Sequence, residues 1–98
     1  MPHCHSAEEE LFVVLEGEGV VELGAEEQPV GPGTVVARPG GTGVAHAFRA
    51  GAGGLVFLAY GMREPSDVCY YPRSNKLFFR GVGIIARLER LDYWDGET

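Results

Sequence analysis

Short apolar runs separated by glycine and proline dominate the chain. Each run is four to seven residues long and is rich in valine, leucine, phenylalanine and tyrosine. The runs cover residues 11–15, 20–23, 34–37, 44–48, 55–60, 68–71, 77–80 and 82–88. Because such runs between turn-forming residues are typical of strands, the pattern predicts an all-β sandwich or barrel. The best candidate for a helix is the tail, residues 87–94.

The first of these runs is apolar on both of its faces. Side chains alternate between the two faces of a strand, so Phe12 and Val14 lie on one face and Leu11 and Leu15 on the other. A strand of this kind needs cover on both sides. In so small a chain the outer cover would come from a second sheet or a second subunit, and we therefore expect a homodimer.

Composition limits the class of protein. With 98 residues, 45% hydrophobic and 22% charged, the chain is expected to form one globular domain over residues 1–98. Two cysteines cannot make a disulfide scaffold, and no apolar run approaches the length of a membrane span. The first residues lack the features of a secretory signal, so we expect a cytoplasmic protein. A net charge of −6 argues against binding to nucleic acid.

The chain has only three histidines, and all of them can face one interior. His3 and His5 are two positions apart, so on a strand both imidazoles lie on the same face. Glu10 follows the polar turn 6–9, which would let the next strand run back beside the first, and His46 lies in a later strand. Three imidazoles and one carboxylate suit a first-row divalent metal. Alone, a pair of histidines two apart is often only a surface feature.

Two motifs around these residues resemble those of the cupin superfamily. In the first, the two histidines and Glu10 are followed, after six residues, by Gly17. In the second, five residues separate Gly33 from Pro39, and the motif continues to His46. The resemblance implies an antiparallel jelly-roll barrel, which can enclose a small ligand cavity.

The resemblance also implies a ligand set and a cofactor. It makes His3, His5, Glu10 and His46 the ligands of one divalent transition metal per chain, which could be Mn, Fe, Zn or Ni. Glu8 and Glu9 offer rival carboxylates. The family spacing to the first-motif glycine favours Glu10, and the other two are expected to be solvated turn residues.

The beginning of the chain departs from the family pattern. At least one strand normally precedes the first histidine, whereas only Met1 and Pro2 do here. A ligand so near a chain end needs something to hold it. The metal itself, a strand lent by a neighbouring subunit, or further residues upstream in the natural chain would each serve.

A metal with open positions can polarise a carbonyl, activate water or, as iron, bind dioxygen. The family contains isomerases, lyases and dioxygenases, so the resemblance implies a small-molecule enzyme. Sugar-phosphate isomerisation is one candidate, although the acidic first motif disfavours a dianionic substrate. Two alternatives stay open, because a fold does not fix a function: a non-catalytic ligand-binding or sensor module, and a barrel whose metal is purely structural.

A few further residues are candidates for roles around the site. The candidate substrate-binding residues are Phe48, Tyr60, Tyr70 and Arg73. Tyr70 and Arg73, with Tyr71, belong to the most polar-aromatic segment outside the motifs, for which the alternative is a hairpin with a solvated arginine. The tail with Trp94 is expected to dock on the barrel or on the partner subunit, and the alternative is a lid over the cavity. Cys4 and Cys69 are expected to be free thiols.

Overall fold

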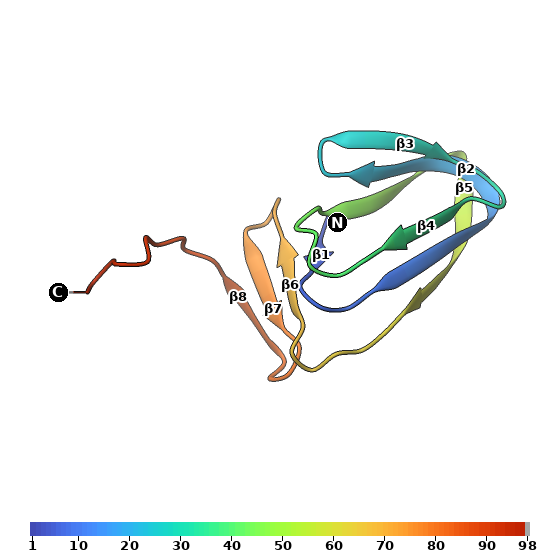
Figure 1. Cartoon of the computed structure of the whole chain (residues 1–98). Helices are drawn as coiled ribbons and strands as arrows, with labels where there is room; N and C mark the ends of the chain where they lie inside the picture. Colours follow the sequence, from blue (N-terminus) through green and yellow to red (C-terminus); the bar gives the residue numbers. More distant parts are fainter. Residues whose placement is uncertain (98) are drawn as a thin grey trace.

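The computed structural model describes residues 1–97 of the chain. Its regular elements are β-strands, so the predicted all-β class is confirmed (Figure 1). The strands are β1 (Cys4–His5), β2 (Glu10–Leu23), β3 (Glu26–Val30), β4 (Val35–Arg38), β5 (His46–Gly61), β6 (Val68–Tyr71), β7 (Lys76–Phe79) and β8 (Ile84–Arg87). Within the described range, nothing forms a helix long and apolar enough to cross a membrane.

The first sheet is built around β2. Strand β5 pairs antiparallel with nearly the whole length of β2, while β3 and β4 pair with its two halves. The sequence predicted two strands over 11–15 and 20–23, and two more over 44–48 and 55–60. These predictions of separate strands were wrong, because each pair is joined into one long strand. Glycine-rich segments that were expected to end strands lie inside them.

Gly17 shows how β2 continues through a glycine. The register of β2 against β5 shifts on either side of it, and Gly17 has a φ of +83°, a conformation that favours glycine. A Cβ at this position would overlap the carbonyl oxygen of Gly54 on β5. Absence of a side chain therefore lets the two backbones pass closely at an irregularity of the sheet.

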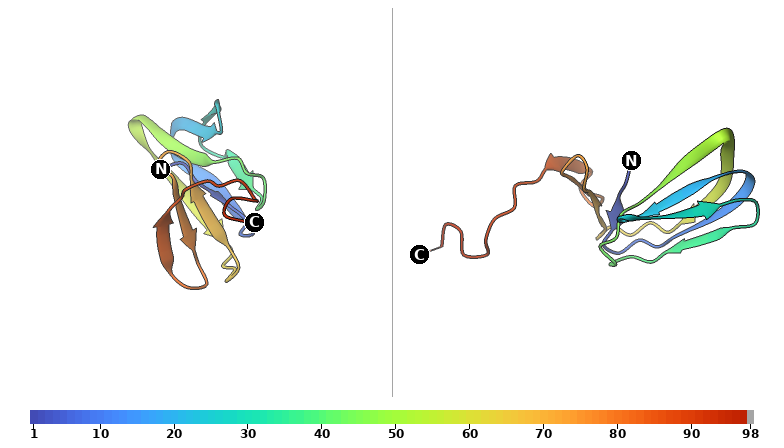
Figure 2. Two further views of the ribbon diagram at one scale, coloured as in Figure 1. Left: turned by 90° about the vertical axis from the view of Figure 1, so that its left-hand side faces the viewer. Right: turned by 90° about the horizontal axis from the view of Figure 1, so that it is seen from above.

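The second sheet is antiparallel in the order β1-β6-β7-β8. Strand β1 lies along β6, with His5 opposite Cys69. The two sheets meet where His3 exchanges backbone hydrogen bonds with His46 at the start of β5, at 3.2 and 2.9 Å. This arrangement is consistent with a cupin jelly roll, although closure of the sheets into a barrel is not detected among residues 1–97 (Figure 2).

The buried apolar core is formed by residues of the first sheet. It consists of Val14, Val21 and Val30, with partly buried apolar neighbours packed against it. Nearer the second sheet, the rings of Phe12 and Phe48 contact each other in an edge-on arrangement, with centroids 4.8 Å apart. The core therefore supports β2 and β5 up to the point at which the sheets meet.

The segment after β8 runs away from the rest of the molecule (Figures 1 and 2). The helix predicted over 87–94 is wrong, because β8 ends at Arg87 and turns follow. A segment this short is not stable as a helix unless it packs against something. Trp94 is 69% exposed and contacts the ring of Tyr93, so it does not dock on the sheets of its own chain.

The outer face of β2 is partly uncovered. Leu11 and Leu15 are 39% and 54% exposed, as expected of a strand that is apolar on both faces and covered on one. The homodimer that would cover them stays a prediction.

Candidate metal centre

The four predicted ligands come from both sheets, and the three histidines among them surround one carboxylate oxygen of Glu10. The Nε2 atoms of His5 and His46 lie 3.0 and 3.1 Å from Oε1 of Glu10, and Nε2 of His3 lies 3.8 Å from it. His5 belongs to β1 and His3 precedes it, whereas Glu10 opens β2 and His46 opens β5. The four residues that the sequence pattern singled out therefore lie together at the junction of the two sheets.

Buried polar atoms in this cluster lack hydrogen-bond partners. Within the described residues, Oε1 of Glu10 and Nε2 of His46 are buried and make no hydrogen bond. Such atoms are costly to bury unless something binds them. Ligands about 2.1 Å from a divalent ion and at right angles to each other lie about 3 Å apart, which is close to the two shortest separations found here. The donor set therefore fits a divalent transition metal.

His46 is a neutral candidate ligand at neutral pH. Its side chain is buried beside the other two histidines. Burial, together with the nearby positive charges of His3, Arg38 and His5, lowers the pKa of His46 to about 4. Metal ligation requires an unprotonated imidazole nitrogen, so no proton has to be removed from His46 before a metal binds.

The thiol of Cys69 lies close to the same histidines. Ligand atoms of His3, His5 and Cys69 lie within 4.8 Å of one another, as do those of His3, Glu10 and His46. Both cysteines are free, as predicted, and both are buried. Burial raises the pKa of Cys69 to about 11. Since the thiolate is the form that binds metals, the group that contains Glu10 is the better site.

Glu8 does not occupy the place that the sequence predicted for it. It was expected to be a solvated turn residue, but it is 3% exposed. Its carboxylate accepts hydrogen bonds from the guanidinium of Arg80 and from the backbone N–H of Glu64. The prediction was wrong because its partners lie far along the chain, where no local pattern reveals them.

Behind His5 lies a second buried carboxylate, that of Asp67. It accepts hydrogen bonds from Nδ1 of His5 at 2.8 Å and from the backbone N–H groups of Ala7 and Glu8 at 3.0 Å. Burial raises the pKa of Asp67, but the hydrogen bonds outweigh it and the net shift is downward. A charged carboxylate is thus held against the ring edge that faces away from Glu10.

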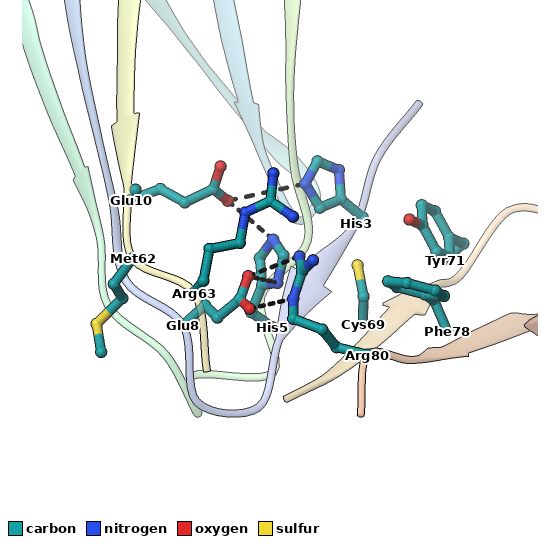
Figure 3. A pocket seen from close by; sticks show the side chains of 11 residues that line it. His3, His5, Glu8, Glu10, Met62, Arg63, Cys69, Tyr71, Phe78 and Arg80 are labelled. Atoms are coloured by element: carbon teal, nitrogen blue, oxygen red, sulfur yellow. Dashed lines mark hydrogen bonds and ion pairs between the residues drawn. The ribbon is translucent and has the colours of Figure 1, made fainter. Parts of the chain in front are cut away.

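Two cavities flank the candidate metal centre and share His3 and Glu10 in their walls. One, of about 370 Å³, is polar and is also lined by His5, Arg63 and Tyr71 (Figure 3). The other, of about 310 Å³, is more apolar and is lined by aromatic side chains of the first sheet. Both volumes are within the range of small-molecule sites.

Comparison with known proteins identifies the family. The chain matches the cupin domain family over residues 1–59, which is more than half of its length. This chain is a cupin. No curated protein sequence matches it.

Two solved structures are similar to this cupin. One is the crystal structure of "Putative sugar phosphate isomerase" from Acidithiobacillus ferrooxidans, which shares 32% sequence identity at a TM-score of 0.77 and matches 92% of this chain and 62% of its own. The other, from Silicibacter pomeroyi, is described as a sugar phosphate isomerase from a cupin superfamily. It shares 27% identity at a TM-score of 0.79 and matches 89% of this chain and 57% of its own. The cupin described here thus spans about three-fifths of the length of these relatives.

The four candidate substrate-binding residues of this cupin lie in different places. Phe48 lines the apolar cavity beside His46. Tyr60 is 75% exposed, Tyr70 accepts a hydrogen bond from Arg90, and Arg73 pairs with a glutamate on β2. Of these four, the structure brings Phe48 to the apolar cavity beside the candidate metal centre and Tyr70 to a further cavity that borders His5.

Arg63 and Tyr71, which are not among those four, both line the polar cavity. Tyr71 neighbours Tyr70 on β6, and the alternation of faces along a strand explains why Tyr71 lines this cavity while Tyr70 lines another. Sequence reasoning missed Arg63, which follows β5 in a segment without a motif. Only its position, directly after a long strand whose end faces the candidate ligands, could have suggested it.

The buried His46 of this cupin makes the stability of the metal-free protein depend on pH. Its pKa is about 4 when folded and about 6.5 in an unperturbed state, so between these values the unfolded chain binds more protons. Stability from this residue is complete above pH 6.5 and is lost as the pH falls toward 4. We expect His46→Gln to flatten the rise of the thermal midpoint between pH 4 and 6.5. Equal slopes for both proteins in the presence of a chelator would contradict this.

Proposed function

We propose that this cupin is a metal-dependent isomerase that acts on small phosphorylated sugars. The observation that carries the proposal is a cationic side chain, Arg63, in the same polar cavity as the candidate metal ligands (Figure 3). A sugar phosphate offers a carbonyl and hydroxyls for a metal at one end and a phosphate for a guanidinium at the other. The names of the two similar structures support the same substrate class.

Two arginines line the polar cavity, and they differ in whether a carboxylate pairs with them. Arg80 is paired with the buried Glu8, whereas the ion pairs found among residues 1–97 do not include Arg63. An arginine without a carboxylate partner can bind a phosphate in a bidentate manner. This cation offsets the acidic first motif, which on sequence grounds disfavoured a dianionic substrate.

The remaining residues of the cavity orient the substrate. When bound, a divalent metal would polarise a carbonyl and lower the pKa of a hydroxyl that it contacts. Burial and the neighbouring Cys69 raise the pKa of Tyr71 to about 12, so its hydroxyl keeps its proton at neutral pH. Tyr71 would therefore donate a hydrogen bond to a sugar oxygen rather than act as a base.

Turnover assays test this proposal against its alternatives. The chain would be loaded separately with Mn²⁺, Fe²⁺, Zn²⁺ and Ni²⁺ and given pairs of phosphorylated and unphosphorylated aldoses and ketoses, with product followed by NMR. We expect aldose–ketose interconversion of phosphorylated sugars. Oxygen consumption by the iron form would indicate a dioxygenase, and ligand binding without turnover a sensor. Loss of stability in chelator, with no ligand bound by any form, would indicate a structural metal.

Replacement of Arg63 by Met should weaken binding of the phosphorylated substrate. Hydrogen bonds to charged groups contribute about 1.5–3 kcal/mol, so KM should rise roughly 10–100-fold while metal affinity stays unchanged. Arg87→Met is the matched control, since Arg87 lies exposed on β8 and donates to a backbone carbonyl away from the cavity. Equal KM values for the two variants would contradict a role of Arg63 in phosphate binding.

A further inference from the structure

The ring of His5 lies between Asp67 and Glu8 on its Nδ1 side, where Oε1 of Glu8 is 3.5 Å from Nδ1, and Glu10 on its Nε2 side. Nδ1 lies 2.8 Å from Oδ2 of Asp67, and Nε2 lies 3.0 Å from Oε1 of Glu10. Since a neutral imidazole carries its proton on only one nitrogen, its capacity to bind a metal through Nε2 depends on which carboxylate takes the N–H. The surroundings of Asp67 decide this.

The carboxylate of Asp67 is fixed as an acceptor. Asp67 is 1% exposed, and its Oδ1 already accepts the backbone N–H groups of Ala7 and Glu8 at 3.0 Å each. Backbone donors of this kind stabilise an ionised carboxylate. Its other oxygen, Oδ2, points at Nδ1 of His5 and requires a hydrogen there. The lone pair of His5 is then left on Nε2, on the side of Glu10.

We infer that Asp67 is a positioning residue of the metal centre, which holds the proton of His5 on Nδ1 so that Nε2 is free to bind the metal. This inference rests on the metal site of the proposed function, but it concerns a residue that neither cupin motif contains. Asp67 precedes β6 and lies 62 positions from His5 along the chain. Metal-bound histidines commonly donate their second N–H to a carboxylate, and loss of such a partner costs about 10–100-fold in metal affinity.

An asparagine at position 67 separates positioning from structural support. The two backbone N–H groups need an acceptor, so the amide oxygen of Asn would take the place of Oδ1 and its NH₂ group would face His5. An NH₂ group can only donate to Nδ1, which moves the proton of His5 to Nε2. The loop contacts would be kept while the ligand atom is blocked.

The test compares wild type, Asp67→Asn and Asp92→Asn as an exposed-tail control. We expect Asp67→Asn to bind Co²⁺ about 10–100-fold more weakly, with an altered visible absorption spectrum of the bound cobalt. Its thermal midpoint without metal should stay within a few degrees of wild type. In ¹⁵N NMR of the metal-free proteins, at a pH where the ring is neutral, the proton of His5 should be on Nδ1 in wild type and on Nε2 in the variant.

Several outcomes would overturn the inference. Wild-type cobalt affinity and spectrum in folded Asp67→Asn would do so, as would a neutral His5 of wild type with its proton on Nε2. The NMR measurement needs only wild type, so it tests the inference even if the variant fails to fold. If wild type itself binds no Co²⁺, the proposed metal-dependent function fails, whereas the NMR result still reports separately on the proton of His5.

Discussion

Replacing Glu10 with Gln should reduce the affinity of this cupin for divalent metals by more than about 100-fold, since even partners of metal ligands contribute 10–100-fold. All three histidine Nε2 atoms lie within 3.8 Å of Oε1 of Glu10. The substitution removes the carboxylate charge that faces all three histidines, and an amide NH₂ placed toward His46 would donate to the lone pair of its nitrogen. Titration of the metal-free protein with Mn²⁺ and Co²⁺ measures the loss.

Glu9→Gln is the control for this experiment. It removes the same charge one residue away, from an exposed side chain. We expect it to bind metal as wild type does. If Glu9→Gln and Glu10→Gln lower the affinity equally, the effect comes from overall charge, and the assignment of Glu10 as a ligand is wrong.

Replacing Gly17 with Ala should destabilise the fold by about 2–3 kcal/mol or more. A non-glycine residue at a strained φ costs about 1–3 kcal/mol, and Gly17 has a φ of +83°. The new Cβ would also overlap the carbonyl oxygen of Gly54, so β2 and β5 would have to separate at their irregularity. Chemical denaturation of the metal-free protein measures this difference in the free energy of unfolding.

Gly53→Ala provides the comparison on the opposite strand. A Cβ at Gly53 meets no atom within 4 Å, and its φ lies outside the left-handed region. Substitution there should be neutral or stabilise by about 0.4–1 kcal/mol, because alanine restricts the unfolded chain. A stability of Gly17→Ala equal to that of Gly53→Ala would show that the close approach of the strands is not a constraint on the fold.

The sequence predicted the class of fold and the closeness of the candidate ligands, and it did so for a physical reason. Apolar runs between turn residues mark the segments that will be buried. Short buried segments of this kind form strands. The two histidines are two positions apart, and a glutamate follows after a short turn. A strand and a hairpin fix the relative positions of such residues, so the local pattern predicts that they lie together. Both signals are local, so His3, His5 and Glu10 could be brought together before the structure was known.

What the sequence did not reveal depends on partners that are distant along the chain. Glu8 is buried because Arg80 lies beside it, and Asp67 faces His5 because β6 pairs with β1. Strand β3 was not predicted because it is polar and contains Pro29, which strands tolerate only at sheet edges. The long strands were missed because a glycine can bridge an irregularity as readily as it can end a strand.

The candidate ligands are shared between the two sheets, with His3 and His5 at β1 and with Glu10 and His46 at the ends of β2 and β5. The two hydrogen bonds between His3 and His46 and the ion pair of Arg73 with Glu22 also join the two sheets. An ion bound by the candidate ligands would link the two sheets. Loading the site should therefore slow amide hydrogen exchange in β1 and β6 together with the start of β5. Exchange in the distant hairpin of β2 and β3 should stay unaffected.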